Sequence, residues 1–230
     1  MNIEIDLSKF KFCFALPAYD GKLCMETCQS MLESTNKMTQ MGIPWSMVSL
    51  KSCALVDSAR NQLMHKFLHE TNADILIFID TDISWKWESM ERLLAWSTMY
   101  DCVSGIYCSR KDPANFVIHV DKYELNEYGL LPISGAGLGF TAISRLALEQ
   151  LDVPEYHTQE YTLPLKQFTA VGVVDGVYIG EDIHFFKVLK EHGIQSYADP
   201  GIILKHHGTK TYEYQFQDIL SKLLGENNGF

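Results

Sequence analysis

The sequence lacks any hydrophobic run long enough to cross a membrane. Its longest strongly apolar run, residues 75–79, is far below the ~18 residues that a transmembrane helix needs. Residues 1–6 carry acids where a secretory signal would carry bases, and no long apolar stretch follows them. We therefore expect a cytoplasmic protein that has no membrane partner.

Basic residues are also scarce. Lysine and arginine total 19 against 29 aspartates and glutamates, which gives a formal charge of −10. Proteins that coat nucleic acid or anionic membranes need an excess of Lys and Arg, so this composition argues against such a role while allowing a local basic groove. The six cysteines include no CxxC pair. Without an export signal, we expect them to be reduced and to pack as small apolar side chains.

What is present is the composition of an ordinary globular protein, with 230 residues of which 47% are hydrophobic. We expect one domain over residues 1–230. The first half alternates strand and helix, with strands at 10–16, 45–50 and 74–79 and helices at 23–38, 56–69 and from 85. A 3.6-residue spacing gives the inner faces of the first two helices, which include Met31, Leu32 and Met38 and then Ala59, Leu63, Met64 and Phe67. This order predicts an α/β fold with a parallel sheet, whose ligands bind beyond the carboxyl ends of the strands.

The second half is less regular. It contains a strand-like stretch at 101–109, an irregular hairpin region at 117–131, a glycine-rich strand at 134–143, a short helix at 145–151, a loop-rich segment at 152–178, a helix from 180 to 192 and a last strand at 201–205. We expect these pieces to extend the sheet in mixed orientation, with loops reaching over one edge.

Asp80-Thr81-Asp82 follows the most apolar strand and is the most informative triplet. Carboxylates at this edge of a sheet suit Mg²⁺ or Mn²⁺ that bridges a diphosphate. We expect the side chains of the two acids to point in different directions. One alternative is that Asp82 or Ser84 only caps the following helix. Another is a phosphatase with Asp80 as nucleophile, which is weaker because Ser84 stands where Thr or Val is expected.

Arg60 lies near the same edge, on the second predicted helix. Its guanidinium can hold a phosphate or fix a carboxylate such as Asp80. The alternative is a surface arginine paired with Asp57, one turn earlier on the helix.

Two further pairs of polar residues lie at the ends of predicted elements. Glu181 and Asp182 open a helix, where they are either favourable first-turn acids or, for Asp182, a general base. His206 and His207 follow the last strand, and adjacent strand residues face opposite ways, so only one of them can share a site with the carboxylates.

Seven segments in this order resemble the GT-A fold of the family-2-like, nucleotide-sugar-dependent glycosyltransferases, especially the compact phage-encoded members. The segments are 17–21, 58–61, 79–82, 103–107, 137–140, 180–182 and 206–208. The resemblance spans about residues 11–212. It implies a mostly parallel mixed sheet flanked by helices, with a nucleotide-binding half at about 10–108, an acceptor-side half at about 109–212 and a C-terminal tail at 213–230.

The resemblance also implies roles for individual residues. The donor nucleotide and sugar would contact Pro17, Ala18, Tyr19, Asp20, Arg60, Asp80, Thr81, Gly137 and Gly139. Among these, Tyr19 would flank the base and Asp20 would bind a uracil-type edge or ribose. Asp82 and His206 would bind Mn²⁺ or Mg²⁺, with His207 the less favoured ligand. Asp182 would be the catalytic base of an inverting transfer, supported by Glu181.

The implied activity is transfer of one sugar, since the sequence lacks the Gln-x-x-Arg-Trp segment of processive synthases. The acceptor expected first is a hydroxymethylated pyrimidine in phage DNA, modified in the host cytoplasm, with a local groove formed by 110–111, 122 and 205–210. Aromatic residues of the loop 156–178 would help to reach the base. The alternatives are a glycan or protein acceptor, or a non-catalytic nucleotide-sugar or glycan-binding module. A nucleotidyltransferase is disfavoured because no basic residue precedes Lys22 in the first loop.

Overall fold

The computed structural model describes residues 5–111, 115–174 and 176–226. Its centre is a seven-stranded sheet in the order β2-β1-β3-β9-β5-β14-β7. The strands are β1 Phe12–Pro17, β2 Trp45–Leu50, β3 Ile75–Ile79, β5 Cys102–Ser104, β7 Leu131–Ile133, β9 Phe140–Ser144 and β14 Ser196–Ala198. Five strands run in one direction, and β9 and β7 run against them. This confirms the predicted mixed, mostly parallel α/β sheet.

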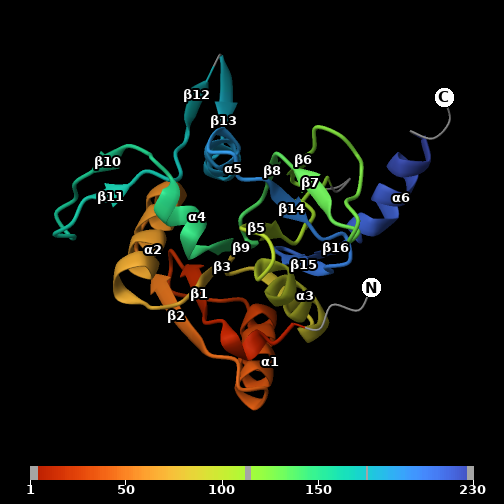
Figure 1. The fold of residues 1–230 in the computed structure, drawn as a ribbon, viewed down its shortest axis with the longest axis horizontal. Coiled ribbons are helices and arrows are strands. Elements are labelled where there is room, and N and C mark those ends of the chain that lie inside the picture. The colour runs from red at the N-terminus through yellow and green to blue at the C-terminus, as the bar shows by residue number, and fades with distance from the viewer. Residues whose placement is uncertain (1–4, 112–114, 175, 227–230) are drawn as a thin grey trace.

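Helices cover both faces of this sheet (Figure 1). They are α1 Met25–Gln40, α2 Val56–Glu70, α3 Trp87–Ser97, α4 Arg145–Gln150, α5 Glu181–Glu191 and α6 Phe216–Glu226. The apolar side chains of α1 and α3 share one core cluster, and those of α2, α4 and α5 share the other. The segment expected as a C-terminal tail contains α6, whose Phe216 and Leu220 are buried in the second cluster.

Strand alternation explains how one sheet serves two cores. In β1, Phe12 and Phe14 join the α1–α3 cluster, whereas Cys13 faces α2. In β3, Ile77 faces the first cluster and Phe78 the second, and all five residues of this strand are buried. Burying each such phenylalanine or isoleucine contributes about 1.5–3 kcal/mol. Continuous burial is expected of a strand that has helices on both sides.

The face of α1 differs from the prediction. Met31 and Met38 are buried as expected, but Leu32 is 63% exposed. The other buried positions of α1 are Thr27, Ser30 and Ser34. Ser30 and Ser34 fill small spaces against Trp85, and their hydroxyl groups bond to its backbone and indole. The predicted inner face of α2 is confirmed, since Ala59, Leu63, Met64 and Phe67 are all buried.

Short strands complete the second half. They are β4 Ile83–Trp85, β6 Ile118–His119, β8 Gly135–Ala136, β10 Glu155–Tyr156, β11 Leu165–Lys166, β12 Gly172–Val174, β13 Val177–Ile179, β15 Leu204–His207 and β16 Thr211–Glu213. The predicted glycine-rich strand is in fact two strands, β8 and β9, which lie in different sheets. The predicted last strand begins later than expected and includes both histidines. Within the described ranges, no helix is both long and apolar enough to span a bilayer.

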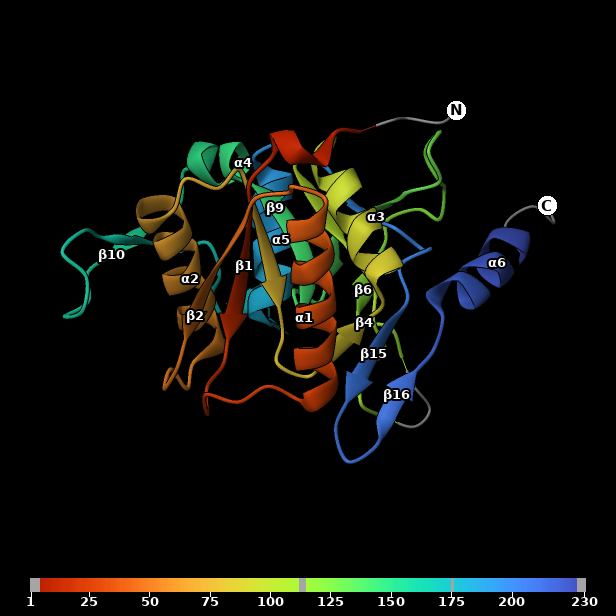
Figure 2. The same ribbon diagram turned by 90° about the horizontal axis from the view of Figure 1, so that it is seen from below.

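The strand β15 connects the second half to the site. It pairs antiparallel with β4, which places His206 opposite Ile83, and with β16 on its other side. Figure 2 shows β4, β15 and β16 near the end of the sheet toward which β1 points. The carboxyl ends of the parallel strands and the histidine strand therefore lie at the same end of the molecule.

Candidate active site

Asp80 and Asp82 diverge into two separate clusters. The chain turns between β3 and β4, where the Asp80 backbone N–H donates to the Gly139 carbonyl oxygen at 3.0 Å. The Asp80 carboxylate contacts Arg60, whereas the Asp82 carboxylate contacts Arg110 and His206. The two acids diverge as predicted, but the cause is the turn after β3, because residues two apart in one continuous strand would lie on the same face. The helix-cap alternative is wrong, because α3 begins after Lys86 and receives no side-chain cap from Asp82 or Ser84.

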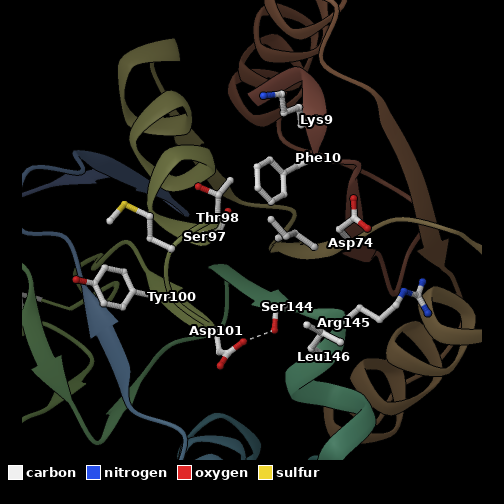
Figure 3. A pocket seen from close by; sticks show the side chains of 12 residues that line it. Lys9, Phe10, Asp74, Ser97, Thr98, Tyr100, Asp101, Ser144, Arg145 and Leu146 are labelled. Atoms are coloured by element: carbon white, nitrogen blue, oxygen red, sulfur yellow. Dashed lines mark hydrogen bonds between the residues drawn. The ribbon is translucent and has the colours of Figure 1, made fainter. Parts of the chain in front are cut away.

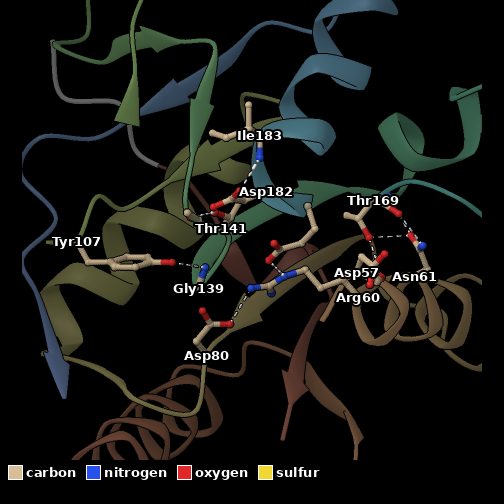
Figure 4. Close-up of polar contacts among 12 residues, drawn as sticks. Asp57, Arg60, Asn61, Asp80, Tyr107, Gly139, Thr141, Thr169, Asp182 and Ile183 are labelled. Carbon is tan, nitrogen blue, oxygen red and sulfur yellow. Dashed lines mark hydrogen bonds and ion pairs between the residues drawn. The ribbon is translucent and has the colours of Figure 1, made fainter. Parts of the chain in front are cut away.

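The first group, here the Arg60 cluster, consists of Arg60, Asp80 and Glu181. Figure 4 shows Arg60 pointing toward Asp80. Arg60 Nη2 lies 3.0 Å from Asp80 Oδ1, and Arg60 Nε lies 3.3 Å from Glu181 Oε1. The Arg60 side chain is 3% exposed. The predicted contact with Asp80 is confirmed. The surface pairing with Asp57 is wrong, because the Arg60 side chain is buried and its guanidinium packs over the ring of Phe78 in β3.

Electrostatics and burial make the Arg60 guanidinium a permanent charge. Burial alone would lower its pKa, but the facing carboxylates of Asp80 and Glu181 outweigh this and raise the pKa above its usual value. Arg60 Nη1 is buried and has no hydrogen-bond partner among the described residues. An unpaired donor on a buried cation is costly.

Tyr107 packs against the same cluster, and the sequence prediction did not include it as a site residue. The Gly139 N–H donates to its hydroxyl oxygen at 3.1 Å. Burial, and then the charge of Asp80, raise the pKa of Tyr107, so this hydroxyl keeps its proton. The only sequence signal was its position at the end of the segment 103–107.

Gly137 and Gly139 are required here for close packing. A Cβ on Gly139 would lie 2.5 Å from Asp80 Oδ2, and one on Gly137 would collide with the Tyr107 hydroxyl. The groups that approach these two glycines closely are therefore side chains of the protein itself, Asp80 and Tyr107. Their part in lining a sugar pocket stays a prediction.

The second group, here the Asp82 cluster, consists of Asp82, Arg110 and His206. Asp82 Oδ2 lies 2.8 Å from Arg110 Nη1 and 3.5 Å from His206 Nε2. Burial would raise the pKa of Asp82, but the hydrogen bond and charge that His206 supplies when it is protonated, and the charge of Arg110, lower it overall. The carboxylate is thus ionised at neutral pH. Arg110 was expected only in a basic groove, and its contact with Asp82 was not foreseen.

The two histidines of β15 have opposite environments, as strand alternation predicts. His206 Nδ1 lies 2.8 Å from the Cys108 carbonyl oxygen, which can only accept. Nδ1 therefore carries the proton, and in the neutral ring Nε2 presents its lone pair toward Asp82. His207 is buried on the other face and bonds Ser84 and Thr211. Of the two, His206 shares a cluster with Asp82.

This arrangement fits a divalent cation that is shared with a substrate. A histidine that donates its other ring nitrogen to a carbonyl is oriented as metal-binding histidines usually are. One carboxylate and one imidazole are few ligands, and no group of three or more His, Cys, Asp or Glu side chains gathers for a metal within the described part of the chain. Mg²⁺ and Mn²⁺ sites with few protein ligands are completed by water and substrate phosphate.

Glu181 and Asp182 have different partners, although they are adjacent. Glu181 faces Arg60, whereas Asp182 Oδ1 accepts the backbone N–H of Ile183 at 2.8 Å. A Cβ on Gly180 would lie 2.9 Å from that oxygen, so the glycine makes room for the Asp182 carboxylate. No described residue bonds the second oxygen of Asp182, which leaves it available at the start of α5.

The first loop lies at the ends of β1 and β2. The Ala18 N–H donates to the Leu50 carbonyl oxygen, and the Ser52 N–H donates to that of Tyr19, both at 2.9 Å. Pro17 ends β1, beside the strand that leads to Asp80. Tyr19 is 64% exposed. Asp20 forms an exposed ion pair with Lys22, and the Thr81 carbonyl oxygen accepts the Cys24 N–H at the start of α1.

Asn61 is a positioning residue whose role was not predicted, although it lies in the segment 58–61. Its side chain accepts the Thr169 N–H and donates to the Thr169 carbonyl, each at 2.9 Å. Asn61 thereby ties the loop-rich segment 152–178 to α2, directly beside Arg60. The sequence signal was only its place next to that arginine.

A pocket of about 480 Å³ lies at the opposite edge of the sheet (Figure 3). Its polar lining includes Lys9, Asp74, Asp101 and Arg145. Arg145 already donates to the carbonyl oxygens of Phe67, Leu68, Thr71 and Ala73, at and beyond the end of α2. This arginine therefore closes a helix end, and none of the predicted site residues lines the pocket.

Comparison with known proteins supports the fold. No family model and no curated protein sequence matches the chain. Similar solved structures include A197 from STIV, at a TM-score of 0.54 and 21% identity, with 86% of each chain covered. Another is GalNAc-T7 with UDP, GalNAc and Mn²⁺, at a TM-score of 0.51 and 9% identity, covering 83% of this chain and 42% of that one. The chain therefore has a GT-A-like fold, as the sequence resemblance implied.

Proposed function

We propose that this protein is a metal-dependent glycosyltransferase of the family-2-like type, which moves one sugar from a nucleoside diphosphate to an acceptor hydroxyl with inversion. The main support is the divergence of Asp80 and Asp82 at the carboxyl end of β3. One carboxylate is fixed by a buried arginine, and the other is ionised beside an oriented imidazole. The compact phage-encoded members are the ones that it resembles.

The donor would bind along the ends of β1 and β3. Pro17, Ala18, Tyr19 and Asp20 would hold base and ribose, and the exposed Tyr19 ring is free to flank a base. Arg60 would orient Asp80, whose Oδ1 lies 3.0 Å from Arg60 Nη2, toward the donor. The remaining donor contacts are Asp80, Thr81, Gly137 and Gly139. UDP is preferred because Asp20 can accept the imide N–H of uracil, and GalNAc-T7 was solved with UDP.

Asp82 and His206 would hold the Mn²⁺ or Mg²⁺. When bound, such a cation neutralises the charge that develops on the leaving diphosphate. The lowered pKa of Asp82 keeps its carboxylate in the ionised form that binding requires. The protonated Nδ1 of His206, bonded to Cys108, keeps Nε2 as the ligand atom.

Asp182 would accept the proton of the acceptor hydroxyl. Its second carboxylate oxygen has no partner in the described chain, whereas Glu181 is bound to Arg60. The start of a helix favours a charged carboxylate, which a general base must be. Glu181 supports the site by holding Arg60.

The choice of acceptor depends on the Lys and Arg side chains that were expected to form a DNA-binding groove. Arg110 pairs with Asp82, Lys122 with Glu124 and Lys205 with Glu213. These pairs neutralise three of the cations expected to form a DNA-binding groove. An uncharged hydroxyl acceptor such as a glycan is favoured over a modified pyrimidine in DNA, because duplex binding depends on an excess of Lys and Arg and this chain has a formal charge of −10.

The proposal is tested by calorimetry with UDP, GDP and CDP, each with and without Mn²⁺. The wild type should bind UDP most tightly and only weakly without Mn²⁺. Asp82→Asn should lose the Mn²⁺-dependent part, while Asp121→Asn, an exposed acid in a separate ion pair with Lys190, should retain it. Unchanged Mn²⁺-dependent binding in Asp82→Asn would refute the metal assignment, and tight GDP binding without UDP binding would refute the donor assignment.

A further inference from the structure

Arg110 holds the carboxylate oxygen that faces His206. Its Nη1 lies 2.8 Å from Asp82 Oδ2 and donates a second, longer bond to the His207 carbonyl oxygen at 3.4 Å. His206 Nε2 lies 3.5 Å from the same Oδ2 atom. A guanidinium and an imidazole thus converge on one oxygen, the atom with which the Asp82 cluster would bind a cation.

The backbone around Arg110 favours this contact. A Cβ on Gly208 would lie 2.9 Å from Arg110 Cδ, so the arginine stem crosses the chain where β15 ends and no side chain obstructs it. The base of the Arg110 loop is closed by the Ser109 N–H, which donates to the Asn115 carbonyl at 2.6 Å, and by a bridge between Cys108 and Phe116.

The Arg110 head group can leave Asp82 at little cost. Its side chain is 51% exposed, so the guanidinium can move without being drawn from a buried site. Arg60, at 3% exposure, has no such freedom. Diphosphate oxygens compete well for an arginine because they accept two parallel charge-assisted bonds.

From these contacts we propose that Arg110 is an internal counter-cation that occupies Asp82 until a nucleoside diphosphate arrives. The inference rests on the proposed function, since it concerns how the same site admits its metal. Without nucleotide, a divalent cation must displace the guanidinium from Oδ2. With nucleotide, the diphosphate draws the guanidinium away and frees Asp82 at the moment when the phosphates supply the missing metal ligands. Metal and nucleotide binding are thereby coupled.

Removing the Arg110 charge should change the affinity for Mn²⁺ modestly and in one direction. Exposed ion pairs are weak, so removing the competition should tighten binding of Mn²⁺ alone by roughly two- to fivefold. The factor by which UDP strengthens Mn²⁺ binding should fall correspondingly, because part of that factor is the release of Arg110. A merely structural role for Arg110 would weaken both measurements.

The test titrates Mn²⁺ into the full chain with and without UDP, following free Mn²⁺ by electron paramagnetic resonance. Arg110→Gln should bind Mn²⁺ alone more tightly and show a smaller UDP enhancement. Lys205→Gln is the matched control, because it removes a positive charge next to His206 from a residue that pairs with Glu213 instead of Asp82. Arg110→Lys should lie between wild type and Arg110→Gln, and thermal melting checks that each variant folds.

Each outcome decides the inference. Tighter Mn²⁺ binding in Arg110→Gln with no change in Lys205→Gln supports it. Equal tightening in both variants overturns it in favour of general electrostatics, and no tightening overturns it outright. If either overturning result occurs while the wild type still binds Mn²⁺ more tightly with UDP than without it, the inference fails but the proposed function survives. If no variant binds Mn²⁺ with or without UDP, both the inference and the proposed function fail.

Discussion

The acids of the Arg60 cluster and the Asp82 cluster, Asp80 and Asp82, are two residues apart in the sequence. Each forms an ion pair with an arginine, yet the surroundings of the two pairs differ sharply. The Arg–Asp contacts measure 3.0 Å in the first and 2.8 Å in the second. The first guanidinium is 3% exposed and faces two carboxylates, whereas the second is 51% exposed and faces one. Distance alone does not separate them. Burial makes the Arg60–Asp80 pair a fixed part of the fold. The exposure of Arg110 leaves the Arg110–Asp82 pair free to exchange partners.

The largest effect should be on the rate of sugar transfer, and it should come from Asp182, which lies next to Glu181 but does not contact Arg60. Asp182→Asn removes the proposed base and should slow sugar transfer by about 10²–10⁴-fold while UDP-sugar binding stays normal. Glu181→Gln is the matched variant, since it removes the adjacent acid but leaves Asp182. It should lose much less rate. Transfer rates and calorimetry distinguish the two variants.

Two results would contradict this assignment of the base. One is near-normal turnover in Asp182→Asn, which would also suit a base elsewhere in the site. The other is a product that keeps the anomeric configuration of the donor. No transfer by the wild type to any glycan or DNA acceptor, with UDP-sugar still bound, would instead favour a non-catalytic binding module.

The next effect concerns stability. Arg60→Met keeps most of the side-chain volume but leaves Asp80 and Glu181 without their shared cation. Breaking a buried pair by removing one partner typically costs about 3–5 kcal/mol, so urea denaturation should show a loss of that order. If Arg60→Met unfolds at the same urea concentration as the wild type, the Arg60 cluster is no more integral to the fold than the Asp82 cluster.

The same contrast explains which features the sequence could predict. The strands β1, β2 and β3 and the inner face of α2 follow from local apolar patterns, and they were predicted. The exposure of Leu32 was not, because Ser30 and Ser34 bond a tryptophan on another element. Strands of two or three residues, such as β4 and β8, owe their conformation to partners distant in sequence, so no local pattern marks them.

Within the site, the sequence suggested which residues belong together but could not show how deeply they are buried. A contact of Arg60 with Asp80 was predicted, whereas its burial and its bond to Glu181 needed α5 to be placed against α2. The approach of His206 to Asp82 depends on pairing between β15 and β4. Nothing in the sequence around Arg110 indicates that it contacts Asp82.

A smaller effect is expected for the exposed pair. Arg110→Gln should change the free energy of unfolding by only about 0.2–1 kcal/mol, because an exposed ion pair is screened by solvent and costs side-chain entropy. Urea denaturation alongside Arg60→Met gives the comparison directly. A loss as large as that of Arg60→Met would show that Arg110 is held as firmly as Arg60, and would also remove the basis for its exchange between Asp82 and a diphosphate.

The smallest effect is a dependence of stability on pH. The folded-state pKa of Asp82 is below the ordinary value of an aspartate, because His206 and Arg110 outweigh burial. A carboxylate whose pKa is lowered on folding contributes stability that is fully present above the unfolded pKa and is lost as pH falls through the folded pKa. The difference in unfolding free energy between wild type and Asp82→Asn should therefore shrink as the pH falls from about 5 through the folded-state pKa of Asp82. Adding Arg110→Gln to both proteins should reduce this pH dependence, since the Arg110 charge is one cause of the lowered pKa of Asp82.

Parallel stability curves for wild type and Asp82→Asn over that pH range would contradict this prediction. They would mean that Asp82 gains no net stabilisation from its cluster, and that Arg110 does not hold the Asp82 carboxylate.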